Sequence, residues 1–307
     1  MKNADMTPGA ALFVIFLCML FGGNGVAMKM GYTGIGPFTS AGIRFTLASV
    51  LLVFWARYKN IPLKMNRDQW RLILVQCLLF VVQVAGFHLG LDKTTASHGA
   101  LVANVLPFMV LILAHFFIPG DRITVKKGSG ILLGFIGVVF LFFDQPALDA
   151  DLKTGDLLVL TAVVCWSVSA VYVKRIIDRF NAVQITLYPM VFGVPFFFAG
   201  GVLWDSAMIT TVTPTVVKAL VYQGAVTAAF GFVAWNTLLQ KFGATALHSF
   251  VFIVPLAGVS SGVAFLGEPI TPQLLVAICC IVAGIMVVNL RKRKKSPVVP
   301  SHRPPFS

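Results

Sequence analysis

Long apolar runs, separated by short polar or charged segments, make up most of the chain. Most runs are close to the ~20 residues that an α-helix needs to cross the hydrocarbon core of a bilayer. Backbone groups in hydrocarbon must find their hydrogen bonds within the same segment, so each run predicts a transmembrane helix. The predicted spans cover residues 10–30, 38–57, 70–90, 97–117, 128–143, 156–174, 183–203, 216–239, 246–265 and 271–290.

Composition supports an all-α integral membrane protein with ten transmembrane helices. Hydrophobic residues make up 58% of the chain and charged residues only 11%, with a mean hydropathy of +0.88. A soluble domain carries roughly 25% charged residues, so this chain has too little polar surface to dissolve in water. The first run has only Lys2 and Asp5 before it and no small-x-small cleavage motif, so we expect it to be retained as the first helix.

The distribution of charge predicts the orientation in the membrane. Most of the 24 Lys and Arg residues lie in segments that share one side with the N-terminus, chiefly 57–71, 122–127, 174–179 and 291–303. Cytoplasmic loops carry such an excess, so both termini are predicted to be cytoplasmic and the protein is placed in the cytoplasmic (inner) membrane. This distribution explains the net charge of +13 without a nucleic-acid partner.

Weak similarities in the same order indicate an internal repeat. Lys93 precedes Pro107 by fourteen residues, and Lys241 precedes Pro255 by the same interval. Each proline is followed by a similar motif, Gly-Asp-Arg-Ile-Thr in one half and Gly-Glu-Pro-Ile-Thr in the other. An odd number of helices per repeat forces the second copy to enter the membrane from the opposite side, as in many secondary transporters.

The chain is accordingly divided into two inverted five-helix repeats. We assign residues 1–143 to the first repeat and 156–290 to the second. An acidic external linker, 144–155, joins them, and a basic cytoplasmic tail, 291–307, is predicted to be disordered. Inverted repeats usually place the substrate site near the midplane of the membrane, between the two halves.

Two motifs in the first repeat resemble those of a known family. Phe-Gly-Gly-Asn at 21–24 is followed by Lys29, and Pro37-Phe38 is followed by Arg44. With the repeat signature, this pattern resembles the drug/metabolite transporter superfamily, EamA type, over about residues 10–290. The resemblance implies transport of metabolites, amino acids or drugs, often as efflux, and does not fix a substrate. The chain departs from the family pattern by having Phe21 in place of Trp and Asp121 in place of Glu.

Arg44 is the one charge predicted to lie deep in the membrane, about seven residues inside the second span. A charge near the centre of a membrane helix costs roughly 2.5–3.5 kcal/mol on insertion scales, so it should face protein or a water-filled cavity. Two roles are open. Arg44 either braces carbonyl groups of the first helix or binds a carboxylate or phosphate of the substrate. The equivalent position in the second repeat is Pro189, so this charge occurs once.

The acidic residues all fall in loops or at predicted helix ends. A multidrug antiporter for cations needs a buried carboxylate that exchanges a proton for the substrate. The sequence therefore disfavours proton coupling through a buried carboxylate, and also strongly cationic substrates. His88, His115 and His248 lie near helix ends, where interfacial or capping roles are expected, and His88 is the best candidate for a proton relay.

Polar and aromatic residues recur along single faces of several spans. In the third span, Gln76, Phe80, Gln83 and Phe87 follow helical spacing. Interhelical hydrogen bonds, worth about 0.6 kcal/mol on average, explain any one such residue, but the set is better explained by a central cavity. The predicted substrate-binding residues are Asn24, Arg44, Gln83, His88, Asn104, Trp166, Tyr172, Phe230 and Phe252. Pro107 and Pro255 are predicted to kink their helices and to serve in gating.

No cofactor or metal site is predicted. The five cysteines all fall inside predicted spans, without the spacing of metal ligands. Small residues line one face of the fifth span and one face of the tenth. These faces can pack against each other or in a homodimer.

The sequence favours a secondary transporter that moves a small metabolite by alternating access, as an exporter or facilitator. Amino acids, other zwitterions and neutral-to-anionic solutes fit a cavity with one deep cation. A proton-coupled antiporter is the first alternative, and a channel is less favoured because no filter-like motif is present. An enzyme is not expected, because the chain lacks motifs such as G-x-S-x-G or H-E-x-x-H. The predicted partners are the substrate and the lipid bilayer.

Overall fold

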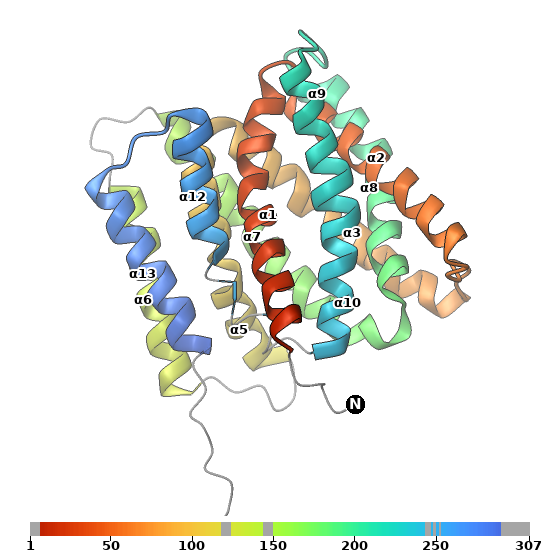
Figure 1. Ribbon diagram of the computed structural model, residues 1–307, viewed down its shortest axis with the longest axis horizontal. Helices are drawn as coiled ribbons and strands as arrows, with labels where there is room; N and C mark the ends of the chain where they lie inside the picture. Colours follow the sequence, from red (N-terminus) through yellow and green to blue (C-terminus); the bar gives the residue numbers. More distant parts are fainter. Residues whose placement is uncertain are drawn as a thin grey trace, which may run out of the picture.

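The computed structural model describes residues 7–117, 124–143, 150–242, 247, 250–251 and 253–289 (Figure 1). Within these residues every extended regular element is a helix, which confirms the all-α fold class. The chain begins with α1 (Pro8–Tyr32), α2 (Pro37–Tyr58), α3 (Arg67–Lys93), α4 (Ala96–Ala103), α5 (Leu106–Phe117) and α6 (Val125–Phe143). It continues with α7 (Ala150–Ile176), the 3₁₀-helix η1 (Ile177–Arg179), α8 (Ala182–Trp204), α9 (Pro214–Val221), the π-helix η2 (Tyr222–Gly231), α10 (Phe232–Phe242), α12 (Ile253–Leu266) and α13 (Pro272–Asn289).

Seven helical segments in the described part of the chain are long and apolar enough to cross a membrane. They are Pro8–Tyr32, Pro37–Tyr58, Arg67–Lys93, Ala96–Phe117, Asp151–Arg179, Ala182–Trp204 and Pro214–Phe242. Shorter apolar helices cover Gly128–Gly137, Ile253–Leu266 and Pro272–Val287, where the sequence predicted further spans. The total of ten spans stays a prediction.

Two of the predicted spans are interrupted. The fourth divides into α4 and α5 at Asn104 and Val105, directly before Pro107. Proline has no N–H for the preceding turn, so the helix restarts with Pro107 as its second residue. Pro255 has a similar place, in the first turn of α12. The eighth span changes from α9 to the π-helix η2 and then to α10, a widening that hydropathy did not predict.

Local sequence explains where several helices begin. Asn66 and Gln69 form a reciprocal capping box at the start of α3, and Asn181 and Gln184 form another at the start of α8. The N-terminus of α2 is capped from a distance, because the Asp205 carboxylate accepts hydrogen bonds from the backbone N–H groups of residues 38 and 39 at 3.1 and 2.9 Å. These caps satisfy backbone donors that a helix leaves free at its N-terminus.

The helices before residue 144 pack mainly against helices after residue 149. The most extensive contacts pair α6 with α13, α3 with α7, α2 with α8, and α1 with α12. Figure 1 shows α6 and α13 side by side at the left edge, and α2 near α8 on the right. One buried cluster, around Phe108, joins α4, α5, α6, α7, α12 and α13. A second, around Phe45 and Phe197, joins α2, α3, α8 and η2.

Candidate functional site

A buried cation stands at the centre of the candidate site. Arg44 lies on the third turn of α2 and is only 5% exposed. Its Nη1 atom is 3.7 Å from the sulfur of Met28, and its guanidinium lies 4.9 Å from the ring centre of Phe45. No ion pair to Arg44 occurs within the described residues. The guanidinium therefore has soft, apolar neighbours and no counterion among them.

One face of α1 lies against this cation. Asn24, Met28 and Tyr32 are four residues apart and so share one side of the helix. The Asn24 Nδ2 atom is 3.3 Å from the sulfur of Met28, which thus lies between Asn24 and Arg44. Tyr32 places its hydroxyl 2.9 Å from Nδ1 of His88 on α3. The α1 face thereby links the arginine of α2 to the histidine of α3.

The π-helix η2 contributes the fourth side. Gln223 donates a hydrogen bond from Nε2 to the Ala27 carbonyl at 2.9 Å, and the Thr227 hydroxyl lies 2.9 Å from Oδ1 of Asn24. Gly31 permits this approach, since a Cβ there would lie 3.2 Å from Nε2 of Gln223. Single π turns within helices occur frequently at functional sites.

Polar atoms without hydrogen-bond partners collect on the same elements. Each such buried atom costs about 1–3 kcal/mol relative to a satisfied one. A polar ligand that entered between α1, α2, α3 and η2 would supply partners for several of them at once. Within the described residues, the buried side-chain atoms without a partner on these four elements are Ser40 Oγ, Arg44 Nε, Ser49 Oγ, Gln83 Oε1, His88 Nε2 and Gln223 Oε1.

The structure brings three of the predicted site residues together, Asn24, Arg44 and His88. His88 is 1% exposed, so its ring is surrounded by protein, and it lies near the end of α3 as the sequence indicated. Gln83 is also buried on α3, with its Oε1 atom unpartnered. Whether these residues bind substrate stays a prediction.

Other predicted residues have local contacts elsewhere. Asn104 donates from Nδ2 to the Ala100 carbonyl at 2.7 Å and ends α4. Tyr172 donates to the Leu72 carbonyl at 3.0 Å. Trp166 meets the ring of Phe87 edge-on, with 6.3 Å between ring centres. These contacts suit helix packing, and their part in binding is untested.

The remaining predictions concern aromatic residues and helix breaks. Phe230 is 46% exposed and packs edge-on against Phe13, so its ring lies at the outside of η2. Phe252 lies outside the described residues. Pro107 and Pro255 lie in first helical turns, and gating by them stays a prediction.

The residues gathered around Arg44, called here the Arg44 cluster, are Asn24, Met28, Tyr32, Ser40, His88, Gln223 and Thr227. Sequence reasoning missed five of them: Met28, Tyr32, Ser40, Gln223 and Thr227. Gln223 and Thr227 did carry a signal, because polar residues four apart inside an apolar span share one helix face. Tyr32 lies just beyond the predicted end of the first span, so span boundaries hid it. Among the described residues, no three His, Cys, Asp or Glu side chains are arranged to hold a metal ion.

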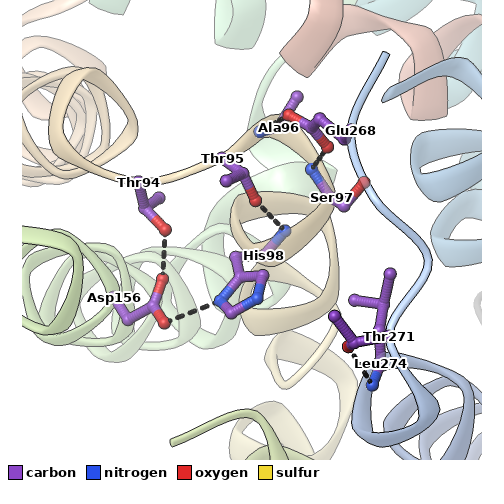
Figure 2. Close-up of polar contacts among 9 residues, drawn as sticks. All are labelled: Thr94, Thr95, Ala96, Ser97, His98, Asp156, Glu268, Thr271 and Leu274. Carbon is purple, nitrogen blue, oxygen red and sulfur yellow. Dashed lines mark hydrogen bonds and ion pairs between the residues drawn. The ribbon is translucent and has the colours of Figure 1, made fainter. Parts of the chain in front are cut away.

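A second buried polar group lies where α3, α4 and α7 meet. Figure 2 shows the Asp156 carboxylate between Thr94 and His98. Thr94 donates its hydroxyl hydrogen to Oδ1 at 2.5 Å, and Nδ1 of His98 lies 3.0 Å from Oδ2. Asp156 is 2% exposed. The sequence correctly placed it near a helix end, but the inference that no carboxylate is buried is wrong, because α3 and α4 cover this end of α7.

Comparisons with known proteins agree with this architecture. The model of the EamA-like transporter family matches residues 8–143 and 153–290. An uncharacterized transporter of Bacillus subtilis, YvbV, is 26% identical over 295 residues, with 95% of each chain covered. A probable amino-acid metabolite efflux pump of Escherichia coli is 25% identical over 302 residues, which is 94% of this chain and 98% of the relative.

The fold also has a counterpart among solved structures. One crystal structure superposes with a TM-score of 0.70 at 17% identity, covering 92% of this chain and 96% of its own. At that identity the likeness shows the fold alone. The family match spans both parts of the chain on either side of the acidic linker, and it confirms the resemblance seen in the sequence. The chain belongs to the EamA-like transporter family and is a multi-pass membrane transporter.

Proposed function

We propose that the protein carries a small metabolite with a carboxylate group, such as an amino acid, across the cytoplasmic membrane by alternating access. Export is the favoured direction. The name of the Escherichia coli relative, an efflux pump for amino-acid metabolites, supports both the substrate class and the direction. The alternative, proton-coupled antiport, is supported by a specific observation and is argued in the next subsection.

The pattern of helix contacts supports two inverted halves of five spans. The contact of α3 with α7 has a counterpart in that of α1 with α9 and η2, when the halves are exchanged. The contact of α1 with α12 likewise has a counterpart in the contact of α7 with α4 and α5. The contact of α2 with η2 has a counterpart in the contact of α8 with α3. Exchange symmetry of this kind suits a carrier whose halves rock about a central site.

The observation that carries the substrate proposal is the buried guanidinium of Arg44. A buried charge without a counterion is strongly unfavourable, and an incoming carboxylate would relieve that cost. Arginine binds carboxylates through two parallel N–H···O bonds, and the Nε atom that lacks a partner belongs to that fork. Asn24, Gln223 and His88 offer neutral hydrogen-bonding groups nearby for the rest of a polar substrate.

The alternative role of Arg44 as a brace has less support. In that role, the guanidinium would donate hydrogen bonds to carbonyl groups freed by a break in the first helix. In the structure α1 runs without a break from Pro8 to Tyr32, and Arg44 contacts the thioether of Met28. A thioether is a weak acceptor, so this contact gives little reason to keep a charge in the membrane interior.

The test is counterflow of ¹⁴C-labelled amino acids in proteoliposomes. Arg44→Lys keeps the charge but loses the planar fork, so we expect the apparent affinity to fall about ten- to hundredfold, the value of a charge-assisted hydrogen bond. Arg44→Ala should abolish counterflow of every carboxylated probe. The matched control is Arg57→Ala, which removes an exposed arginine from the end of the same helix and should leave counterflow unchanged.

Thermal stability separates substrate binding from bracing. If Arg44 binds the substrate, Arg44→Ala should melt at or above the wild-type temperature, because an unpaired buried charge is removed. If instead it braces α1, the variant should melt lower and lose transport of neutral and charged probes alike. Normal counterflow by a well-folded Arg44→Ala variant would contradict both roles.

A further inference from the structure

A buried acid–base pair lies outside the Arg44 cluster. Asp156 is the single Asp or Glu side chain that is buried among the described residues. Its partner His98, on the first turn of α4, is buried as well. Burial of both groups sets this pair apart from the nearby ion pair of Lys93 and Asp151, which is largely exposed.

The pair joins the two halves of the chain. Thr94 belongs to the connection between α3 and α4 and His98 to the first turn of α4, whereas Asp156 is on the second turn of α7. Close backbone approach makes this contact possible, since a Cβ at Gly155 would lie 2.8 Å from the Thr94 nitrogen. Figure 2 shows the imidazole of His98 pointing across from α4 to the carboxylate on α7. Any motion that separates α4 from α7 must break the contact.

Other charges near the pair are already engaged or exposed. Glu268 accepts hydrogen bonds from the backbone N–H groups of Ala96 and Ser97 at 2.6 and 2.8 Å, and so caps α4 (Figure 2). Lys29 of α1 donates to the carbonyls of Leu91 and Asp92, both at 3.1 Å. The charged groups at this end of α1, α3 and α7, and after α12, are Lys29, Asp92, Lys93, Asp151, Lys153 and Glu268. The other charges of α3 and α7 lie at the opposite ends of those helices: Arg67, Asp68, Arg71, Lys174 and Arg175.

We propose that Asp156 and His98 form a proton-binding site that couples a proton gradient to transport. With neutral imidazole, the pair carries one negative charge, and uptake of one proton makes the pair neutral overall. The closed interface between α4 and α7 shields the pair from water, so a change in the charge of the pair alters the balance between the closed and the open arrangement. Opening of that interface admits water and allows release of the proton. Protonation therefore biases the carrier between two arrangements of its halves.

A purely structural role predicts different behaviour. Asparagine has nearly the shape of aspartate and can still accept the Thr94 hydroxyl and meet His98. An ion pair that only fastens α4 to α7 would therefore be replaceable by Asp156→Asn with some loss of stability and no change in energetics. A proton-coupling pair loses its titratable carboxylate in that variant, whatever its stability.

The experiment compares two modes of transport by the full-length protein in proteoliposomes. Counterflow of a ¹⁴C-labelled amino acid needs no net proton movement, whereas uphill accumulation driven by an imposed pH gradient does. We expect the counterflow rate of Asp156→Asn to stay within about twofold of the wild-type rate. We expect its pH-driven accumulation to fall at least tenfold below that of the wild type. The control Asp151→Asn removes an exposed carboxylate from the same helix and should leave both counterflow and pH-driven accumulation unchanged. His98→Gln provides a second variant if Asp156→Asn does not fold.

The proposal rests on the transport function above, and the outcomes separate the two. If the wild-type protein shows counterflow but no accumulation driven by the pH gradient, proton coupling is overturned and the transport proposal stands. Equal loss of both modes in a well-folded Asp156→Asn variant also overturns it. If no amino acid shows counterflow, the substrate proposal fails. Proton binding by the pair can then be tested without a substrate, by ¹⁵N-histidine NMR of the protein at different pH values. A His98 signal, assigned with His98→Gln, that does not change between about pH 5 and pH 8 overturns proton binding.

Discussion

The side chains around Arg44 combine one buried charge with neutral polar groups whose hydrogen-bonding capacity is only partly used. His88 uses Nδ1 toward Tyr32 and has no partner for Nε2. Gln223 uses its amide nitrogen toward α1 and has no partner for Oε1. Such half-satisfied groups are expected at a site that exchanges partners with a ligand, because a packed structural network would satisfy all of them.

The Tyr32 hydroxyl is predicted to hold His88 in place. Tyr32→Phe removes the partner of Nδ1, so we expect a loss of about 1–3 kcal/mol of stability. Counterflow should weaken because the ring is then free to turn. Melting in detergent and counterflow assays measure the two effects. The control is Tyr58→Phe at the exposed end of α2, which should change neither, and unchanged melting of Tyr32→Phe would contradict the positioning role.

Sequence reasoning found the residues of the site whose signal is local. Arg44 is conspicuous as a charge in an apolar run, and Asn24 and His88 as polar groups in theirs. Ser40 and Gln223 were missed because their importance comes from contacts across helices. Gln223 meets a carbonyl 196 residues earlier in the chain, and no periodicity within one span encodes that pairing. Asp156 was misjudged for the same reason, since its covering helices are remote in sequence.

At the scale of helices, hydropathy predicted the positions of the long elements well. Predicted spans 38–57 and 183–203 correspond to α2 and α8 within a few residues. The division of the fourth span and the π-helix η2 were not predicted in this form. Pro107 indicated a kink but not a restart of the helix. A π-helical turn is rare, so the pattern of apolar residues within one span does not predict it.

The close crossing of α1 and α12 depends on a glycine. A Cβ at Gly22 would lie 2.5 Å from the Ala257 Cβ and 2.7 Å from the Val254 carbonyl oxygen. Gly22→Ala should therefore force the helices apart and cost about 1–3 kcal/mol, the usual penalty for overpacking. Gly9→Ala on the same helix meets nothing within 4 Å and should be neutral or stabilising by up to about 1 kcal/mol. Thermal unfolding of both variants measures the difference, and equal melting temperatures would contradict the predicted clash.

At the scale of the whole molecule, charge separates the two ends of the helix bundle. At one end, basic segments 57–71 and 174–179 lie together, because Gln69 donates to the Arg179 carbonyl at 2.5 Å and Asn181 to the Pro62 carbonyl at 2.9 Å. At the other end, the turn after α1 pairs with the segment after α8, and carboxylates such as Asp205 cap helices. This polarity matches what the excess of basic residues on cytoplasmic surfaces requires.

The polarity predicts which surfaces are reached from outside the cell. Ala150 begins α7 and Asn66 caps α3, at opposite ends under the proposed orientation. In a background without the native cysteines, a membrane-impermeant maleimide should label Ala150→Cys on intact cells and should label Asn66→Cys only after the membrane is permeabilised. The positive-inside bias makes the reverse insertion unfavourable, because several Lys and Arg side chains near residue 66 would have to cross the membrane. The reverse labelling pattern would overturn the orientation. Labelling of both sites on intact cells would show that residues 66 and 150 lie on the same side of the membrane. That result would contradict the inverted arrangement of the two halves.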